Sequence, residues 1–470
     1  MSDSRISRAC SAPKKLTRRE NLGERGAFGG FGSIQLIFES DRLYRCGRAA
    51  LALSMLFCSP LSMAQSDTAP LHCRLEFLEE LGWKIERVAG DFVQVHGGSP
   101  CDRADLAAAH AAGDLELRLP QNSDAWLAQP ESGPILDRVI ADIASGCAFA
   151  IQIGDATRKA VDKLIANPKF EFSGLQTGWI GFGAGSAADA GWRPIFDWNR
   201  GLVPTDSNSR AISAFYERPV RAECGVGRQI AQYATLAELF GAAGFDRAFK
   251  RDEIVIGTFN KLGRSRSILL GSGRGDMFAD GLAKKTSVLG RQAFNGAPGF
   301  LHHVFDASTL SDLNNQAQNF VVYDVDAAAA AALRGHGGFA HYNRINRRIW
   351  ELSQPFQIRG LRWFERLLYQ RDTRLRARLT TRERELYEQM RTLMDDPFYR
   401  GFRVYGHPHG VKPIGYFVAR MLDRNPRTPY RVELALHNLR TEVFRRYTRD
   451  RIEACSAAPG THASRTPSTQ

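Results

Sequence analysis

The chain has 470 residues, of which 43% are hydrophobic and 24% are charged, the balance of a globular protein with a large core or two to three domains. It contains no run of eighteen or more uncharged apolar residues, so no permanent membrane span is expected in the mature chain. The formal net charge is +13, and nearly all of the surplus falls in residues 341–453, with 25 Lys and Arg against 13 Asp and Glu.

The basic stretch 341–453 admits several partners. A surplus of Lys and Arg suits a nucleic acid, an anionic membrane surface or an acidic polymer. Arginine recurs at the polar positions of expected helices with glutamate in between, a pattern typical of a solvated helical surface. We therefore expect a solvated face that can dock to an anionic surface, and we do not expect nucleic acid to be the partner.

A leader precedes the main body of the chain. Three arginines in 42–48 come before the apolar run 49–57, and small residues lead up to Ala64. This order predicts a signal peptide cleaved after Ala64 and a periplasmic or secreted protein, with a buried helix as the alternative. Residues 1–41 are long and polar for the basic start of a signal, which favours a true translation start near 36–43 or an additional leader.

Export changes what the cysteines are expected to do. The mature chain keeps an odd number of them, namely Cys73, Cys101, Cys147, Cys224 and Cys455. In an oxidising compartment four can pair and one is left over, and Cys224 is the natural leftover. By elimination we expect the bridges Cys73–Cys101 and Cys147–Cys455, although four cysteines allow three connectivities.

The order of expected elements predicts an α+β fold. We divide the chain into a leader and signal peptide (1–64), an N-terminal α/β subdomain (65–134), an α+β core (135–350), a basic, mostly helical region (351–455) and a disordered tail (456–470). Helices are expected at 135–143, 155–166, 225–243, 327–333, 380–394, 412–422 and 429–455, and strands at 92–95, 253–256, 300–305 and 319–324. His407-Pro408-His409 is expected to be a turn between helices, because no third metal ligand lies near it in the sequence.

The most informative segment is Glu223-Cys224, which opens the amphipathic helix 225–243. A helix N-terminus carries unpaired N–H groups and about half a positive charge, which stabilise a thiolate. Cys224 is therefore a candidate nucleophile, and its own backbone N–H is a candidate donor to an acyl intermediate. A buried cysteine or a disulfide half is the alternative.

The motif Glu223-Cys224-x-x-Gly, followed by Tyr233-x-x-Leu236, resembles the Glu-Cys helix of bacterial spore-coat-type protein-glutamine γ-glutamyltransferases. Gln318-Asn319 and the Phe-Ala-His ending at His341 are similar to that family's Glu-Asn strand and its Phe-Ala-His. The resemblance implies a papain/transglutaminase-like core in which a cysteine helix packs on an antiparallel sheet. It also implies that Cys224 attacks the side chain of a protein glutamine, releases ammonia and passes the acyl group to a lysine. This chain has Gln318 where the family has its catalytic glutamate.

Several residues are candidates for the catalytic partners of the thiol. His341 carries the family similarity, while His302 and His303 lie on an expected strand, where one of two successive side chains faces the core or a cleft. Asp324 or Gln318 is the candidate to orient the imidazole, and Glu223 can tune the thiol or gate the site. The expected catalytic set is therefore Cys224, His341, His303, Asp324 and Glu223, with no cofactor and no metal.

Three functions fit the sequence. The first is cysteine-dependent acyl transfer on an amide, and the second is a thiol peptidase or amidase that uses the same residues with water as acceptor. The third is a non-enzymatic, envelope-associated binding protein with a basic helical tail.

Overall fold

The computed structural model describes residues 69–81, 83–88, 92–97, 117–120, 143–172, 191–195, 201–257, 265–269, 290–303, 318–358, 377–424, 429–434 and 438–457. The chain divides into two units, and every described residue belongs to the unit that excludes Lys14–Ser66. The expected signal peptide, all but the last residue of the helix expected at 135–143, and Cys101 lie outside the described residues.

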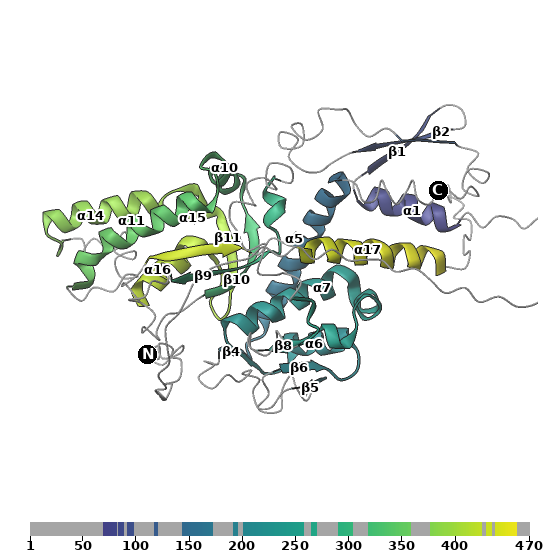
Figure 1. Ribbon diagram of the computed structural model, residues 1–470, viewed down its shortest axis with the longest axis horizontal. Helices are drawn as coiled ribbons and strands as arrows, with labels where there is room; N and C mark the ends of the chain where they lie inside the picture. The colour runs from purple at the N-terminus through teal and green to yellow at the C-terminus, as the bar shows by residue number, and fades with distance from the viewer. Residues whose placement is uncertain are drawn as a thin grey trace, which may run out of the picture. The chain divides into compact units, whose positions relative to one another are not determined.

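Helices and strands are interspersed along the described chain (Figure 1). The α-helices are α1 (Ala69–Glu80), α5 (Ile143–Ala166), α6 (Asn208–Glu217), α7 (Cys224–Ala248), α10 (Ala327–Gly335), α11 (Phe339–Ile358), α14 (Thr381–Met394), α15 (Pro397–Gly401), α16 (Ile414–Arg424) and α17 (Asn438–Ala457). The strands are β1 (Trp83–Val88), β2 (Phe92–Gly97), β3 (Leu117–Pro120), β4 (Phe170–Phe172), β5 (Trp192–Pro194), β6 (Gly201–Pro204), β7 (Val220–Ala222), β8 (Ile256–Gly257), β9 (Pro298–His303), β10 (Gln318–Val325), β11 (Phe402–Gly406), β12 (Gly410–Pro413) and β13 (Tyr430–Leu434). Two short 3₁₀ helices, η2 (Arg251–Glu253) and η4 (Gly290–Phe294), complete the set. The fold is α+β, as the sequence predicts.

The largest described sheet has five strands in the order β12-β11-β10-β9-β13. All of its neighbouring strands are antiparallel. Three of the five, β11, β12 and β13, come from the region that the sequence predicts to be mostly helical. That region therefore supplies both helices and a large part of the sheet. The smaller sheets are β1-β2-β3, β5-β6-β8 and the parallel pair β4-β7.

Helices cover both faces of the five-stranded sheet. Phe320 and Val322 of β10 pack in a core cluster with residues of α10, α11, α14 and α16. Val321, between them, packs in a second cluster with residues of α5 and α7. Because successive side chains of a strand point to opposite faces, α7 lies on one face of the sheet and α11 on the other.

The cysteine helix α7 is held between α5 and the sheet. Ile230, Tyr233 and Ala234 have no solvent exposure and belong to the core cluster that also contains Val321 of β10. The helix is kinked at Gly241, whose φ of 66° and ψ of 168° are not helical. A positive φ is readily adopted by glycine because it has no Cβ. Cys224 is therefore the first residue of α7, and the kink at Gly241 lies near the other end of the helix.

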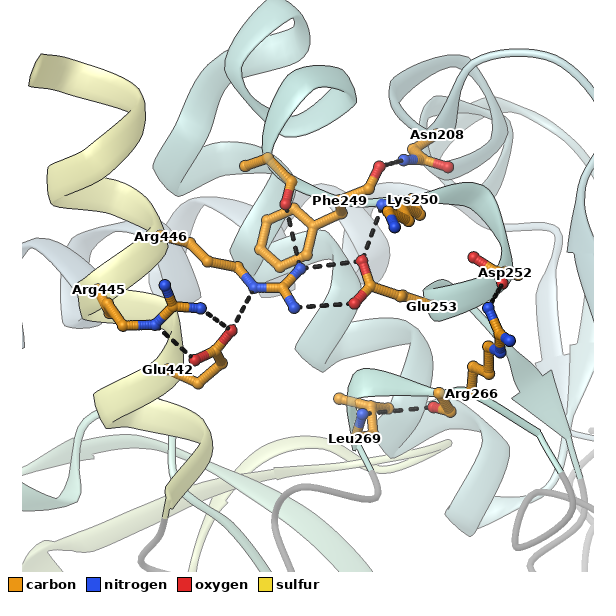
Figure 2. Close-up of polar contacts among 12 residues, drawn as sticks. Asn208, Phe249, Lys250, Asp252, Glu253, Arg266, Leu269, Glu442, Arg445 and Arg446 are labelled. Carbon is orange, nitrogen blue, oxygen red and sulfur yellow. Dashed lines mark hydrogen bonds and ion pairs between the residues drawn. The ribbon is translucent and has the colours of Figure 1, made fainter. Parts of the chain in front are cut away.

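The C-terminal helix α17 is fastened by ion pairs to η2, which follows α7 in the chain (Figure 2). Arg446 makes two bonds to Glu253 of η2, at 2.8 and 2.9 Å, and a third at 2.7 Å to Glu442. Its side chain is only 14% exposed. At least one arginine of the basic region thus serves an internal contact and not a solvated surface.

In the part of the chain that the structure describes, none of the helices has both the length and the apolar character that crossing a membrane requires.

Candidate functional site

Glu223 forms the N-cap of α7 and fixes its first turn. Its backbone is extended, with φ −81° and ψ 173°, and its carboxylate accepts the N–H groups of Gly225 and Val226, each at 2.7 Å. Such a cap satisfies amides that a helix otherwise leaves unpaired. Two of the N–H groups that could stabilise a thiolate are therefore already bonded to the carboxylate.

The sulfur of Cys224 lies between a carboxylate and an amide. Its Sγ donates to Oε2 of Glu223 at 3.3 Å and accepts from Nδ2 of Asn319 at 3.5 Å. Cys224 is 8% exposed and is not part of a disulfide. The pairings of Cys73 with Cys101 and of Cys147 with Cys455 stay predictions, because the side chains of Cys101, Cys147 and Cys455 are not described. The thiol that the sequence singles out is thus reduced and already hydrogen-bonded.

Asn319 reaches the sulfur because of its register in the sheet. It lies opposite Phe300 of β9, and the pairing of Val321 with Tyr405 places it level with His407, just past the end of β11. Asn319 is adjacent to Phe320 on the strand, so its side chain points to the opposite face, which is the face that α7 covers.

Gln318 has a different environment from its neighbour. Its amide donates to the carbonyls of Asn319 at 3.0 Å and of His407 at 3.4 Å, and it is 5% exposed. Gln318 therefore supports the hairpin, and the residue that contacts the thiol is the one after it.

His407 is packed against the start of the cysteine helix. It lies in the hairpin between β11 and β12, so the turn expected between helices in fact joins two strands. Its ring stacks on Phe170 with centroids 4.2 Å apart, and its Nε2 lies 3.2 Å from the carbonyl oxygen of Glu171. A Cβ on Gly227 would lie 2.5 Å from the Cβ of His407. This histidine therefore connects β4, the hairpin and the first turn of α7.

Burial keeps His407 neutral. Loss of solvent lowers its pKa to about 4, although the carbonyls of Glu171 and Ala222 favour the protonated ring. A neutral imidazole has a single N–H and can donate to only one of two carbonyls. The carbonyl of Ala222 lies two residues before Cys224, so the position of this ring is linked to that of the thiol.

Arg228 adds a half-buried positive charge one turn after Cys224. Its Nε has no solvent exposure. Burial lowers the pKa of its guanidinium to about 10, while the negative charges of Glu223 and Cys224 act to raise it. The group stays protonated at neutral pH, and the start of α7 therefore holds a carboxylate, a thiol and a guanidinium together.

The structure places His341 away from the thiol. It lies on α11, where its ring stacks on His336 with centroids 4.1 Å apart and contacts Tyr342 edge-on. Tyr342 belongs to the core cluster on the face of the sheet opposite α7. Burial, His336 and Arg344 lower the pKa of His341. His341 and Cys224 therefore lie on opposite faces of the sheet.

Asp324 is also distant from the thiol. It follows Asn319 by five residues on the same strand, which separates them by roughly 16 Å at the usual rise of a strand. Its carboxylate lies 3.9 Å from Nη1 of Arg158 on α5. Of the five predicted residues, the described contacts bring only Cys224 and Glu223 together.

His303 ends β9, opposite Tyr430 of β13, and its side chain lies outside the described ones. Its neighbour His302 is placed more clearly. Because Phe300 lies opposite Asn319, Phe300 and His302 share the face of the sheet that α7 covers. Nε2 of His302 lies 3.4 Å from Oε2 of Glu433, and this contact lowers the pKa of that carboxyl. An imidazole paired with a carboxylate thus lies on the same side of the sheet as Asn319.

Within the described ranges, no three His, Cys, Asp or Glu side chains are grouped so that they could hold a metal ion. A partly open pocket lies further along α7, lined by Gln232, Thr235 and Leu236 and by residues of α5, of the turn 295–297, of β9 and of α17. These α7 residues lie at least eight positions after Cys224, so the pocket is separate from the thiol.

No protein-family model matches this chain, and no curated protein and no solved structure matches it either.

Sequence reasoning missed Asn319, Arg228 and His407 as members of this site. Arg228 alone had a local signal, because a charged residue four positions after Cys224 falls on the same side of the helix.

Proposed function

We propose that the protein is an exported, cysteine-dependent acyltransferase that acts on an amide through a thioester of Cys224. One observation carries this proposal: the thiol opens a long helix packed on an antiparallel sheet, with its sulfur bonded to Glu223 and Asn319. This is the layout that a papain/transglutaminase-like core requires. The glutamine side chain of a protein or peptide is the proposed substrate, in line with the resemblance of the Glu-Cys helix.

The chemistry needs a proton acceptor next to the thiol. Glu223 takes the proton of Sγ along the existing 3.3 Å contact, and the sulfur then attacks the amide carbon. The S–C bond forms, the C–N bond breaks, and the proton on Glu223 passes to the leaving nitrogen, which departs as ammonia. An amine attacks the thioester, loses a proton to Glu223, and releases the thiol.

The imidazole of the proposed site is that of His302. Its pairing with Glu433 and its place on the covered face of the sheet favour it over His341, which lies on the opposite face. Glu433 would orient the ring, as a carboxylate does in thiol and serine enzymes. Asp324 has no part in the proposed site.

The test is ammonia release from a glutamine dipeptide, with and without a primary amine, by the wild-type chain and by Cys224→Ala. Acyl transfer predicts ammonia release by the wild type alone, together with incorporation of the amine into product. Ammonia without incorporation would make the protein an amidase that uses water. If the two chains release ammonia equally, the catalytic proposal is wrong and a binding role is left.

A further inference from the structure

A thiolate at Cys224 needs positive partners other than the usual helix amides. The N–H groups of Gly225 and Val226 are both bonded to the carboxylate of Glu223. That carboxylate also accepts from the thiol, and a neighbouring negative charge disfavours ionisation of the sulfur. The favourable field of the helix start is therefore largely cancelled where the sulfur lies.

Two groups oppose this effect. Asn319 points Nδ2 at the sulfur from β10. Arg228 lies four residues after Cys224 on α7, which puts both side chains on the same side of the helix, one turn apart. The Nε of its guanidinium is shielded from water, where a charge acts more strongly than it does in solvent.

The charges at the start of α7 balance in both states of the thiol. With the thiol protonated, the carboxylate of Glu223 offsets the guanidinium of Arg228. When the S–H bond breaks and an O–H bond forms on Oε2, the electron pair stays on sulfur and the thiolate offsets the guanidinium instead. The net charge of the three groups does not change, so the transfer creates no uncompensated buried charge.

We propose that Arg228 is the counter-ion of the Cys224 thiolate, with Asn319 as its hydrogen-bond donor and Glu223 as the group that takes the proton. Arg228 thus supplies a positive charge beside the thiolate that does not depend on the imidazole of His302. The inference rests on the proposed role of Cys224 as nucleophile and names the residue that makes the nucleophile available.

The experiment titrates the thiolate of the full chain by its ultraviolet absorbance, with Cys224→Ser as the blank. This readout needs neither a substrate nor access of a reagent to the buried sulfur. In the wild type we expect a thiol pKa below the ordinary value of about 8.5. Arg228→Met should raise that pKa by about one unit or more, which lowers the ratio of thiolate to thiol about tenfold. Arg228→Lys keeps the charge and should stay close to the wild type.

Arg228→Met also removes the positive charge that offsets the half-buried carboxylate of Glu223, and this loss can destabilise the protein. The pair Glu223→Gln and Glu223→Gln/Arg228→Met avoids this problem, because neither variant carries the Glu223 carboxylate without the guanidinium. Its thiol pKa should lie above that of Glu223→Gln. If the two titrate alike, or if Arg228→Met folds and titrates like the wild type, the proposal is wrong.

Ammonia release separates this inference from the proposed function. If the thiol pKa depends on Arg228 but the chain shows no acyl transfer, the counter-ion role is supported and the acyltransferase function is wrong. If Arg228→Met carries out acyl transfer at the wild-type rate, the acyltransferase function is supported and the counter-ion role of Arg228 is wrong.

Discussion

Nδ2 of Asn319 lies 3.5 Å from Sγ of Cys224, although 95 residues separate the two in the sequence. The contact joins the middle of the antiparallel sheet to the first residue of the helix that covers it. Any change in the register of β10 would therefore be felt directly at the sulfur. The same contact gives the thiol a donor from outside its own helix, where Glu223 already occupies two amides.

Replacing Asn319 with Asp should raise the thiol pKa of Cys224. A carboxylate in this position would add a second negative charge beside the sulfur, and a like charge disfavours ionisation. Alkylation by iodoacetamide at neutral pH should slow by up to about tenfold for each unit of pKa gained, because the fraction of thiolate falls while its nucleophilicity rises in part. Asn319→Ala, which only removes the donor, should have a smaller effect in the same direction. Alkylation of the Asp variant at the wild-type rate would show that Asn319 does not act on the sulfur.

Replacing Gly227 with Ala should destabilise the protein. The new Cβ would lie 2.5 Å from the Cβ and 2.8 Å from the Cγ of His407, whose ring is fixed against Phe170. Overpacking of this kind costs about 1–3 kcal/mol in the free energy of unfolding. Thermal or urea unfolding measures it.

The matched control is Gly335 of α10, where a Cβ would meet nothing within 4 Å. Gly335→Ala should be neutral, or stabilising by up to about 1 kcal/mol, since alanine favours the helix. If both variants unfold like the wild type, His407 does not hold the start of α7 as tightly as the contacts indicate.

The elements that the sequence predicts correctly carry their signals locally. Thr380 and Glu383 form the capping box that opens α14, and the side chain of Asp326 caps α10. The strands expected at 92–95 and 319–324 are present as β2 and β10. Each of these depends on residues within a few positions of one another, so a single sequence is enough.

The prediction of a helix at 429–455 is wrong for the first residues of this range. β13 occupies Tyr430–Leu434, and α17 begins only at Asn438. Tyr430, Val432 and Leu434 are buried at alternate positions because the strand pairs with β9. Pro429 followed by mixed polar and apolar residues fits either element, and only the partner strand decides between them.

The residues of the candidate site also fall into those with a local signal in the sequence and those without one. Glu223 and Cys224 are adjacent, so the cap and the thiol could be predicted from the sequence. Asn319 and His407 come to α7 through strand pairing, and a register shift of one residue exchanges the faces of a strand. The sequence therefore indicated Gln318 where the structure uses Asn319.

His407 should make the stability of the protein fall with acid in a defined window. Its folded pKa is about 4, below the ordinary value of 6.5, so the unfolded chain binds a proton that the folded chain resists. The contribution is complete above pH 6.5 and is lost as the pH falls toward 4, at up to about 1.4 kcal/mol per pH unit.

Urea unfolding across this range measures the slope, and His407→Gln should flatten it. His341 also has a lowered pKa and adds to the slope in the same direction. It is less buried, however, so His341→Gln should keep most of the wild-type slope. An unchanged slope in His407→Gln would mean that the ring is not held neutral.

The last prediction concerns the ion pairs that fasten α17 (Figure 2). Arg446 bonds both oxygens of Glu253 and is 14% exposed, whereas its neighbour Arg445 bonds only Glu442 and is 58% exposed. Arg446→Met removes the partner of a largely buried carboxylate and should lower the free energy of unfolding by about 2 kcal/mol. Arg445→Met is the matched control and should unfold at nearly the wild-type temperature, because exposed ion pairs contribute little.

Acid should remove the difference between Arg446→Met and the wild type. Burial acts to raise the pKa of Glu253, but the bonds from Arg446 and from the N–H of Lys250 outweigh it, so the folded pKa lies below 4.5. A carboxyl with a lowered pKa stabilises the folded state above its ordinary value, and this stabilisation is lost as the pH falls through the folded pKa. The wild type and Arg446→Met should therefore converge in melting temperature well below pH 4.5. A gap between them that stays constant in acid would show that Arg446 stabilises α17 by its contact with the ring of Phe249, whose centroid lies 5.1 Å from its guanidinium carbon, and not by its ion pair with Glu253.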